Sequence, residues 1–522
     1  MKIALKPNSA VPLYLQIKEH LQKQIKRGVL PPATRLPSTR SLAEELEVSR
    51  ITVVNAYAEL AVEGWVQAHV GQGTFVSDLR RGVERAGIGE PFPLTGTGTW
   101  QTTLLRPPGV SASNMLADML HLSQQPDLIS FAMGAPATDL FPVRDFRRAI
   151  NVVLRRDGAE ALQYDGAAGY KPLQATIAKY LQARGIKARP REVLITSGSQ
   201  QGLDLAARVL TEPGECVITE SPTYLGALDV FESHGVRVMG VPVDEEGMRV
   251  DILERLISRH RPRLIYTIPT FHNPTGVTMS QGRRERLLAL ARQHHVFILE
   301  DGVCSELRYS GTPLPALKAL DRQGHVVYLN SFSKILLPGI RVGYVVASGR
   351  ILERLVAAKQ SADLFTSSLM QRALAEYLAA ARLEHHLTHV CQVYKARRDA
   401  MLEGLARHLP ADAHWSTPQG GLCLWVNLSS DVSAVQLYLT AIGYGVAFAV
   451  GSVFFPPEGD RPPDADGPDR RPSRSFRLNF AAHRPELIEL GLRRVAKALR
   501  EEMAKRSVCT NRAGEAAAVV TG

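Results

Sequence analysis

The sequence has few cysteines, few aromatic residues and no long hydrophobic run. Its five cysteines are scattered through 522 residues and form no CxxC pair, which excludes a disulfide framework and the usual spacing of zinc ligands. No stretch approaches about eighteen uninterrupted apolar residues, and the start runs into a helical pattern without an apolar leader. We therefore expect a cytoplasmic chain with no membrane span and no bound metal.

The composition is that of a globular protein with a basic character. Hydrophobic residues make up 45% of the chain and charged residues 22%, and 522 residues suffice for two or three domains. The formal net charge is +11, which favours an anionic partner such as nucleic acid. The excess charge is spread along the chain, so a DNA-binding function has to be argued from motifs.

Changes in composition divide the chain into four parts. Residues 1–78 are compact and periodic, whereas residues 79–114 are rich in Gly, Pro, Thr and Arg without a sustained period, which indicates a flexible linker. Over residues 115–505, apolar strand-like runs alternate with helical patterns, which predicts an α/β domain with a mainly parallel sheet. We expect residues 506–522 to form a disordered tail.

The first part contains three helical patterns followed by two short strand-like segments. Apolar residues recur at helical spacing from Tyr14 to Ile25, and Gly28 is expected to end that helix. Ser38 and Ser49 precede two further helices as N-caps, with a tight turn between these helices. This spacing predicts a helix-turn-helix.

The exposed groups of this part suit DNA. The first turn of the third helix offers Arg50, Thr52 and Asn55, which can bond base edges or phosphates in a major groove. The strand-like segments flank Gly71-Gln72-Gly73, a hairpin tip typical of a wing, and we expect Gln72 to be a further DNA contact.

The stretch LPSTRSLAEELEVSRITVVNAYAELAVEGWV, continued by GQGTFV, closely resembles the GntR-type winged helix-turn-helix. The resemblance covers residues 10–77 and implies that Arg35 and Arg40 hold phosphates while Arg50 and Thr52 face the operator. The alternatives are solvated surface charges or a three-helix module that binds another protein.

In the large domain, the segment NSFSKILLPGIRVGYVVA places Lys334 after a strand-like run, near Ser331, Ser333 and Arg341. An amine can form a Schiff base with an aldehyde cofactor, and hydroxyls with a guanidinium suit a dianionic phosphate. A lone lysine is usually a surface charge. The pattern SxSK followed by PGxRxG nevertheless favours pyridoxal 5'-phosphate, with Lys334 as its amine.

Four more segments carry groups that suit this cofactor. Asp301 follows the apolar run VFILE at the carboxyl end of a predicted strand, where it would keep the pyridine nitrogen protonated. Asn273, in PTFHNPTG, could donate to the phenolic oxygen, and Tyr224, in SPTYLGA, could stack on the ring. In ITSGSQQGLDL, the N–H groups of Ser199 and Gln200 would bind phosphate at a helix N-terminus. Read as structure alone, Asp301 is a loop cap, the segment of Asn273 is a turn, Tyr224 is a core residue and the segment of Ser199 is a strand-to-helix turn.

In this order the segments resemble the fold-type I aminotransferases over roughly residues 115–505. The resemblance implies a large α/β domain with a smaller C-terminal α+β subdomain, and a homodimer in which Tyr164 reaches the phosphate of the neighbouring subunit. It implies that Arg477, in SFRLNFA, clamps the carboxylate of a substrate or effector. The residues that it assigns to the cofactor are Lys334, Asp301, Asn273, Tyr224, Ser199, Gln200, Ser331, Ser333, Arg341 and Tyr164.

The sequence departs from the aminotransferase pattern at one place. A tyrosine usually follows the pyridinium aspartate by two or three positions, and Val303 and Cys304 occupy those positions here. Neither side chain replaces a phenol, which disfavours fast turnover without preventing imine exchange at Lys334.

The two parts together resemble the MocR-type subfamily of GntR regulators. The resemblance implies a transcription regulator that binds double-stranded operator DNA and senses an amino acid, an amine or pyridoxal phosphate itself. Two alternatives stay open. The chain could be an aminotransferase with an appended DNA-binding domain, or a regulator whose aminotransferase-like domain has lost its cofactor. The sequence does not decide whether the chain is an enzyme, and the missing tyrosine favours a sensor.

Overall fold

The computed structural model describes residues 13–26, 29–31, 34–46, 48–62, 65–69, 73–76, 128–428, 432–456 and 472–520. The chain divides into two compact units, of which the first contains the N-terminal part and the second spans Pro108–Ala504. The predicted linker at 79–114 lies outside the described residues, as do Gly28 and Gln72.

The N-terminal unit has the predicted winged helix-turn-helix fold. Its described elements are α1 (Leu13–Lys26), α2 (Thr39–Glu45), α3 (Arg50–Val62), β1 (Val66–His69) and β2 (Gly73–Val76). The two strands pair antiparallel, with Val66 opposite Val76, and form the wing. The apolar side chains that set the helical spacing meet in one core, which includes Ile17, Leu42 and Val53 with no exposed surface. The Ser38 hydroxyl accepts the Ser41 N–H at 3.1 Å, which confirms Ser38 as the N-cap of α2.

The large unit is built on an eight-stranded, mainly parallel sheet, as the sequence predicts. In spatial order its strands are β4 (Val193–Thr196), β11 (Gly343–Val346), β10 (Val326–Ser331), β9 (Phe297–Asp301), β8 (Leu264–Thr267), β5 (Cys216–Ser221), β6 (Arg237–Asp244) and β7 (Gly247–Met248). The run from β10 through β9, β8 and β5 to β6 is parallel, and β4, β11 and β7 pair antiparallel with their neighbours.

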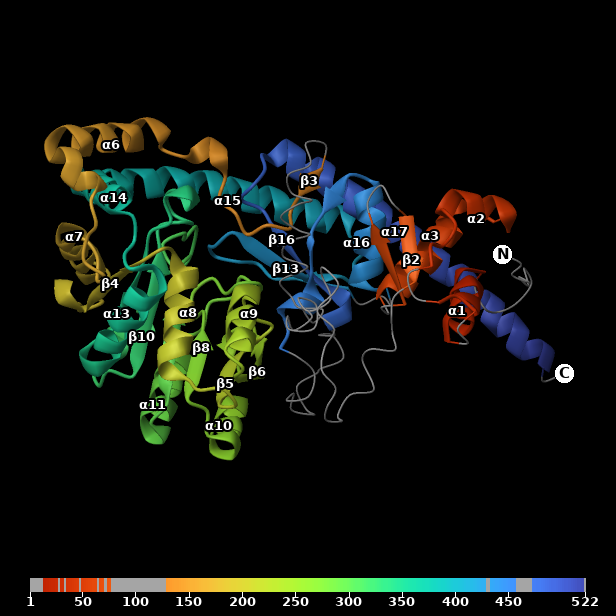
Figure 1. The fold of residues 1–522 in the computed structure, drawn as a ribbon, viewed down its shortest axis with the longest axis horizontal. Helices are drawn as coiled ribbons and strands as arrows, with labels where there is room; N and C mark the ends of the chain where they lie inside the picture. The colour runs from red at the N-terminus through yellow and green to blue at the C-terminus, as the bar shows by residue number, and fades with distance from the viewer. Residues whose placement is uncertain are drawn as a thin grey trace, which may run out of the picture. The chain divides into compact units, whose positions relative to one another are not determined.

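Helices cover both faces of this sheet (Figure 1). One face packs against α8 (Ser199–Leu210), α9 (Leu225–Ser233) and α13 (Gly349–Asp363), and the other against α10 (Val250–His260) and α11 (Gln281–His294). Successive strand residues alternate between the two cores, so that Val217 faces the first and Ile218 the second. Strands buried on both faces read as continuous apolar runs, which is why they stand out in the sequence.

A smaller α+β subdomain follows, as the resemblance implies. Its antiparallel sheet has the order β12 (His414–Trp415), β13 (Cys423–Asn427), β16 (Ser475–Asn479), β15 (Ala449–Val450). A short parallel pair joins β3 (Ile129–Ser130) to β14 (Val446–Ala447). The long helix α15 (Arg382–His408) reaches from the end of α14 toward this subdomain (Figure 1). The other α-helices that the structure describes are α6 (Val143–Asp157), α7 (Lys171–Gln182), α12 (Leu317–Leu320), α14 (Ser368–Ala379), α16 (Ala434–Gly443) and α17 (Pro485–Val520).

Helix α17 does not end where the sequence analysis placed a disordered tail at 506–522. It continues to Val520. The helix is already nucleated by the buried residues Ile488, Leu492 and Leu499, and no proline follows Pro485, so extension by further turns costs little.

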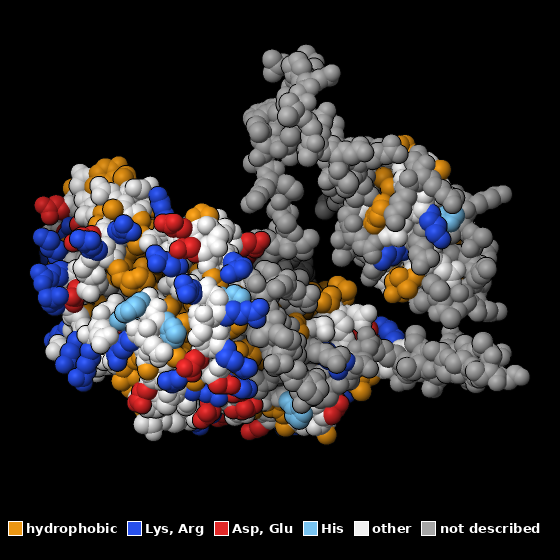
Figure 2. Space-filling view, turned by 90° about the horizontal axis from the view of Figure 1, so that it is seen from below, with side chains coloured by type: hydrophobic (Ala, Val, Ile, Leu, Met, Phe, Trp, Pro, Cys, Tyr) orange, Lys and Arg blue, Asp and Glu red, His pale blue; other side chains and the backbone are white. Residues whose placement is uncertain are grey.

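The surface of the large unit carries charges of both signs. Figure 2 shows Lys and Arg side chains interspersed with Asp and Glu on the face that it presents, without one continuous basic patch. In the part of the chain that the structure describes, no helix has the length and apolar character that a membrane crossing requires.

One buried cation fixes the segment between β8 and α11. Arg284 has no exposed surface, and its guanidinium donates to the carbonyls of Pro269, Met279 and Pro315 at 2.8–3.0 Å and to the Thr270 hydroxyl at 2.9 Å. It therefore ties both ends of the loop that carries Asn273.

Replacing this cation should loosen the loop. Arg284→Met removes the guanidinium donor from the Met279, Pro269 and Pro315 carbonyls, of which Pro269 keeps the Met279 N–H. Each buried group left without a partner costs about 1–3 kcal/mol. We expect a loss of about 3 kcal/mol in the free energy of unfolding, measured by denaturant titration of the full chain. The control is Arg286→Met on the same helix, whose partly exposed pair with Glu254 should contribute about 1 kcal/mol or less. Equal losses in the two variants would contradict the assignment.

Candidate functional site

A cavity of about 150 Å³ lies at the carboxyl edge of the parallel strands, facing the C-terminal subdomain. This is the edge at which α/β sheets bind ligands, because the strand ends and the loops that follow them converge there. Six of the residues predicted from the sequence line the cavity: Ser199, Tyr224, Asn273, Asp301, Lys334 and Arg477.

Lys334 lies in the turn that follows β10, with its amine directed into the cavity. The Nζ atom donates to the Gly134 carbonyl at 2.8 Å. Burial lowers the pKa of the Lys334 amine, and the positive charges of Arg477 and Arg341 act in the same direction. A lowered pKa enriches the neutral amine, which is the nucleophilic form.

Asp301 ends β9 and is buried. Its Oδ2 accepts the Tyr266 hydroxyl at 2.9 Å, and its Oδ1 accepts the Val303 N–H at 3.0 Å. Burial raises the pKa of Asp301, while these hydrogen bonds and the charge of Lys334 act against the shift. A protonated pyridine nitrogen would supply the missing opposite charge, so this carboxylate fits pyridoxal phosphate.

Arg477 on β16 is also buried and has no acidic partner among the described residues. Its guanidinium donates to Asn273 Oδ1 at 2.7 Å and to the Ala132 carbonyl at 2.6 Å, while its Nε atom has no partner there. Burial lowers the pKa of this arginine. A buried guanidinium with free donor capacity fits the carboxylate of a ligand.

The N-terminus of α8 forms a cradle beside Lys334. Gly198 precedes the helix with φ +90°, and a Cβ atom there would lie 2.3 Å from the Nη2 atom of Arg341. A Cβ at Gly343 would lie 2.9 Å from the Ser199 nitrogen. Gly198 lets the Arg341 guanidinium approach the start of α8, and Gly343 lets strand β11 approach the backbone there. A guanidinium beside a helix N-terminus suits a phosphate.

Of the remaining residues predicted for the cofactor, Gln200, Ser331 and Ser333 adjoin residues of this cavity, whereas Tyr164 does not line it. The side chain of Gln200 accepts the Tyr224 hydroxyl at 3.1 Å and donates to the Gly226 carbonyl at 2.9 Å, so it holds Tyr224 in place. Ser331 and Ser333 are buried and hydrogen bonded to each other at 2.9 Å, within the turn that carries Lys334. Tyr164 is 76% exposed and packs edge-on against Phe365.

No phenol stands two or three positions after Asp301. Val303 and Cys304 line the cavity, and burial raises the pKa of the Cys304 thiol to about 12, so the thiol stays neutral. Tyr266 is the nearby phenol that the sequence analysis missed, and it donates to Asp301.

A buried pair behind the cavity also escaped the sequence analysis. Glu220 Oε1 accepts from the Thr267 hydroxyl and the Ile268 N–H, while Glu220 Oε2 and His272 Nε2 lie 3.9 Å apart and have no other described partner. Burial raises the pKa of Glu220 to about 7 and lowers that of His272 to about 3. The signal for Glu220 was present, because it follows the apolar run CVIT at a strand end, as Asp301 follows its own run.

The residues predicted for DNA gather on α2, α3 and the segment before α2. Arg50 and Asn55 are exposed on α3. Arg35 is exposed beside the wing, where its backbone forms an isolated antiparallel β-bridge with Phe75. Arg40 is exposed on α2 and pairs with Glu44 at 3.2 Å. The Thr52 hydroxyl lies 2.8 Å from the Ser49 hydroxyl, so it belongs to the N-cap of α3 as well.

A side chain at the cradle should weaken cofactor binding. Gly198→Ala strains a left-handed backbone and displaces Arg341, so we expect the dissociation constant for pyridoxal phosphate to rise at least about tenfold. The measurement is a titration of the cofactor-free full chain, followed by visible absorbance. Gly339→Ala is the matched control, because a Cβ there meets nothing within 4 Å. Unchanged affinity in Gly198→Ala would exclude the cradle as the phosphate site.

The buried Glu220 should make stability depend on pH. The folded chain keeps this proton up to about pH 7, whereas the unfolded chain releases it near the ordinary value of 4.5, so the wild type loses stability as pH rises through this interval. Glu220→Gln imitates the protonated carboxyl at every pH.

The free energy of unfolding of Glu220→Gln, relative to wild type, should therefore increase by up to about 3 kcal/mol between about pH 5 and about pH 8. Denaturant titrations at the two pH values measure this difference, with the exposed Glu160→Gln as control. A difference that stays constant with pH would refute the buried proton.

Comparison with known proteins agrees with both units. The family described as "Aminotransferase class I and II" matches residues 126–495, and the family described as "Bacterial regulatory proteins, gntR family" matches residues 13–76. Among solved structures, the multiple substrate aminotransferase from Thermococcus profundus shares 36% identity with a TM-score of 0.70, covering 77% of this chain and 97% of that one. The α-aminoadipate aminotransferase LysN from Thermus thermophilus, complexed with N-(5'-phosphopyridoxyl)-L-leucine, shares 37% identity with a TM-score of 0.67, covering 76% and 100%.

Curated relatives extend the similarity to the whole chain. The aromatic-amino-acid aminotransferase 1 of Thermococcus litoralis is 38% identical over 76% of this chain and 94% of its own length. The HTH-type transcriptional regulator TauR of Rhodobacter capsulatus is 32% identical over 95% of this chain and 98% of its own. The regulator YisV of Bacillus subtilis is 31% identical over 95% and 97%.

The enzyme relative thus matches about three quarters of the chain, whereas these two regulators match nearly all of it. The aminotransferase match and the residues of the cavity identify pyridoxal 5'-phosphate as the cofactor. The chain belongs to the MocR-type regulators, in which a GntR-family DNA-binding domain precedes an aminotransferase class I and II domain.

Proposed function

We propose that this chain is a transcription regulator. Its N-terminal DNA-binding unit, called the head below, responds to an amino acid or amine that reaches Lys334 in the large unit, called the body. The observation that supports the proposal is one cavity containing Lys334, Asp301 and Arg477, in a chain whose full-length relatives are named as regulators. The lack of a tyrosine two or three positions after Asp301, where Val303 and Cys304 stand, favours sensing over efficient turnover.

The cavity residues have separable tasks in this proposal. Pyridoxal phosphate, when bound, supplies an aldehyde that reacts reversibly with amines. Lys334 offers its neutral amine there, and an effector amine competes with it. Asp301 balances the charge of the ring nitrogen, and Arg477 selects effectors with a carboxylate through a bidentate contact.

The head reads double-stranded operator DNA in this proposal. Arg50 and Asn55 are exposed on α3 and contact base edges, with Thr52 at the start of the same helix. Arg35 and Arg40 are exposed and bind phosphates, which positions the helix. Gln72 at the wing tip completes the proposed contacts.

The chain is proposed to act in the cytoplasm as a homodimer, with residues 79–114 linking head and body. The exposed apolar side chains Leu162 and Tyr164, at 69% and 76% exposure, support a partner on that surface. Tyr164 is then placed to reach the phosphate of the neighbouring subunit. Paired heads suit paired half-sites on DNA.

An effector acts on the head only through its different affinity for two shapes of the chain. Such coupling is commonly about 1–3 kcal/mol, or about 5–150-fold in affinity. The proposal therefore predicts a change of this size in operator affinity when a cognate amine is added.

Lys334→Ala tests whether amine exchange is the trigger. The operator is selected from a random duplex library with the wild-type full chain, and its affinity is measured by fluorescence anisotropy with a panel of amino acids and amines. We expect the wild type to respond by about 5–150-fold and Lys334→Ala to bind the operator without responding. The exposed Lys171→Ala is the matched control.

Two outcomes would redirect the proposal. A full response in Lys334→Ala would exclude amine exchange at this residue. A response to pyridoxal phosphate alone, with no further effect of any amine, would identify the cofactor itself as the signal.

An aminotransferase with an appended DNA-binding head is the second candidate. It is favoured by the 38% identity to the aromatic-amino-acid aminotransferase of Thermococcus litoralis and by the same cavity residues. A steady-state assay of amino-group transfer to a keto acid decides between the two, because a sensor needs no turnover.

A further inference from the structure

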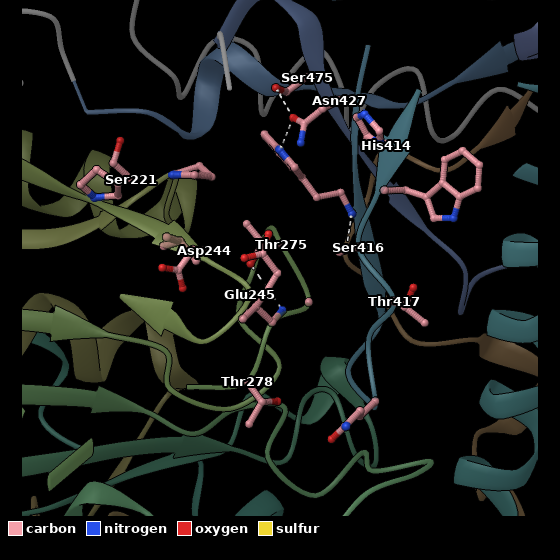
Figure 3. A pocket seen from close by; sticks show the side chains of 18 of the residues that line it. Ser221, Asp244, Glu245, Thr275, Thr278, His414, Ser416, Thr417, Asn427 and Ser475 are labelled. Carbon is pink, nitrogen blue, oxygen red and sulfur yellow. Dashed lines mark hydrogen bonds between the residues drawn. The ribbon is translucent and has the colours of Figure 1, made fainter. Parts of the chain in front are cut away.

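A second, larger cleft lies beside the cofactor cavity, between the β6 edge of the parallel sheet and the C-terminal subdomain (Figure 3). Its volume is about 630 Å³, within the range typical of small-molecule sites. Asp244 and Glu245, at the end of β6, lie on one side, and His414, Ser416 and Thr417 on the other (Figure 3). No residue of this cleft belongs to the cofactor cavity.

Neutral hydrogen-bonding groups dominate the described lining. Six of the lining residues carry a hydroxyl: Ser221, Thr275, Thr278, Ser416, Thr417 and Ser475. Asn427 adds an amide whose Oδ1 accepts the Trp425 indole N–H at 3.0 Å and the Ser475 hydroxyl at 2.8 Å. These contacts fix the amide oxygen, so the amide NH₂ group is the part of Asn427 that can donate to a ligand.

The charge of the described lining disfavours anionic ligands. The chain has 62 Lys and Arg residues, yet none is among the described residues that line the cleft. Asp244 is already held by Arg283, whose Nη2 lies 2.7 Å from Asp244 Oδ2. Among the described lining residues a carboxylate or phosphate finds no Lys or Arg, in contrast to the cofactor cavity with Lys334 and Arg477. A cationic ligand would compete with Arg283 for Asp244, whereas an uncharged ligand can accept or donate hydrogen bonds beside this pair, so an uncharged ligand fits best.

Aromatic rings supply the apolar surface of the cleft. Trp415, Trp425 and Phe455 line it, and two of the four tryptophans of the chain are therefore at this site. Flat aromatic faces beside hydroxyl and amide groups match a ring that presents C–H bonds on its faces and hydroxyls at its edge.

The same loops and strands line both cavities, with different residues facing each one. The loop before α11 presents Asn273 to the cofactor cavity and Thr275 to the cleft. Strand β13 does the same with Cys423 and Trp425, since residues two apart on a strand face the same side.

Strand β16 repeats this arrangement with Arg477 and Ser475. In addition, the Trp425 ring packs edge-on against Phe454, with ring centroids 5.8 Å apart, and Phe454 lines the cofactor cavity. A ligand in the cleft therefore touches the segments that hold the cofactor groups.

We propose that this cleft is a second small-molecule site, for an uncharged polyhydroxylated ring such as a sugar or cyclitol. The hydroxyl and amide groups bind the ring hydroxyls, the carboxylates of Asp244 and Glu245 accept from them, and the indoles cover the ring faces. The ligand has no amine, so it acts independently of exchange at Lys334.

Isothermal titration calorimetry of the cofactor-loaded full chain tests this site. The probes are glucose, myo-inositol and other neutral ring polyols, with glucuronate as the anionic and glucosamine as the cationic analogue of glucose. We expect at least one neutral polyol to bind at one site per chain, and its anionic analogue at least about tenfold more weakly.

A matched pair of variants places the binding in the cleft. Thr417→Arg puts a bulky side chain at an exposed position of the cleft wall and should raise the dissociation constant at least about tenfold. Thr388→Arg, at an exposed position on α15, adds the same charge elsewhere and should leave it unchanged.

Three results would overturn the proposal. They are the absence of binding by every neutral polyol at about 10 mM, equal or tighter binding of the charged analogues, and wild-type affinity in Thr417→Arg. None of these results depends on whether an amine changes operator affinity.

Discussion

Three ionisable side chains at one edge of the sheet make no ion pair with any described residue, and the rest of the body is arranged around them. Asp301 and Arg477 are buried and Lys334 is half-buried, and each is satisfied only by neutral hydrogen-bonding groups. Removing such charges from water costs several kcal/mol unless opposite charges face them. The body holds this unfavourable arrangement because a ligand with matching charges compensates it.

Packing far from the cavity keeps these groups in place. The sheet is buried on both faces, so β9 and β10 cannot shift to relieve Asp301 or the turn of Lys334. Arg284 fixes the loop of Asn273 through backbone carbonyls, and Asn273 in turn accepts from Arg477. The residues of the cofactor cavity thus come from separate elements whose positions depend on the cores that flank the sheet.

A ligand in the cleft next to the cavity would contact the same loops and strands that line the cofactor cavity. Because Thr275, Trp425 and Ser475 each lie two residues from a group of the cofactor cavity, the two sites share one set of loops and strands. Coupling between sites needs an element whose equilibrium between two arrangements both ligands change, and an element that reaches both sites can serve. Here three such elements are present, and a regulator that integrates two small molecules would need no additional domain.

Much of the site could be predicted from local sequence. Asp301 ends a buried strand, and Lys334 and Ser199 come shortly after buried strands. A strand buried on both faces reads as an apolar run whose end is visible in one segment. The helix caps of the head were equally local, and Ser38 forms the cap that its position predicts. The helical continuation of α17 was missed because propagation from a packed helix overrides weak local preference.

The sequence by itself determined which chemical groups this protein carries and in what order, since strand ends, caps and glycine turns are set by neighbouring residues. Only the tertiary structure decided their partners. In the folded chain the Gln200 side chain accepts the Tyr224 hydroxyl, and Glu220 lies beside His272. The second cleft is lined by segments that range in sequence from Ser221 to Ser475. Such contacts depend on how distant segments pack, and no local period records that packing.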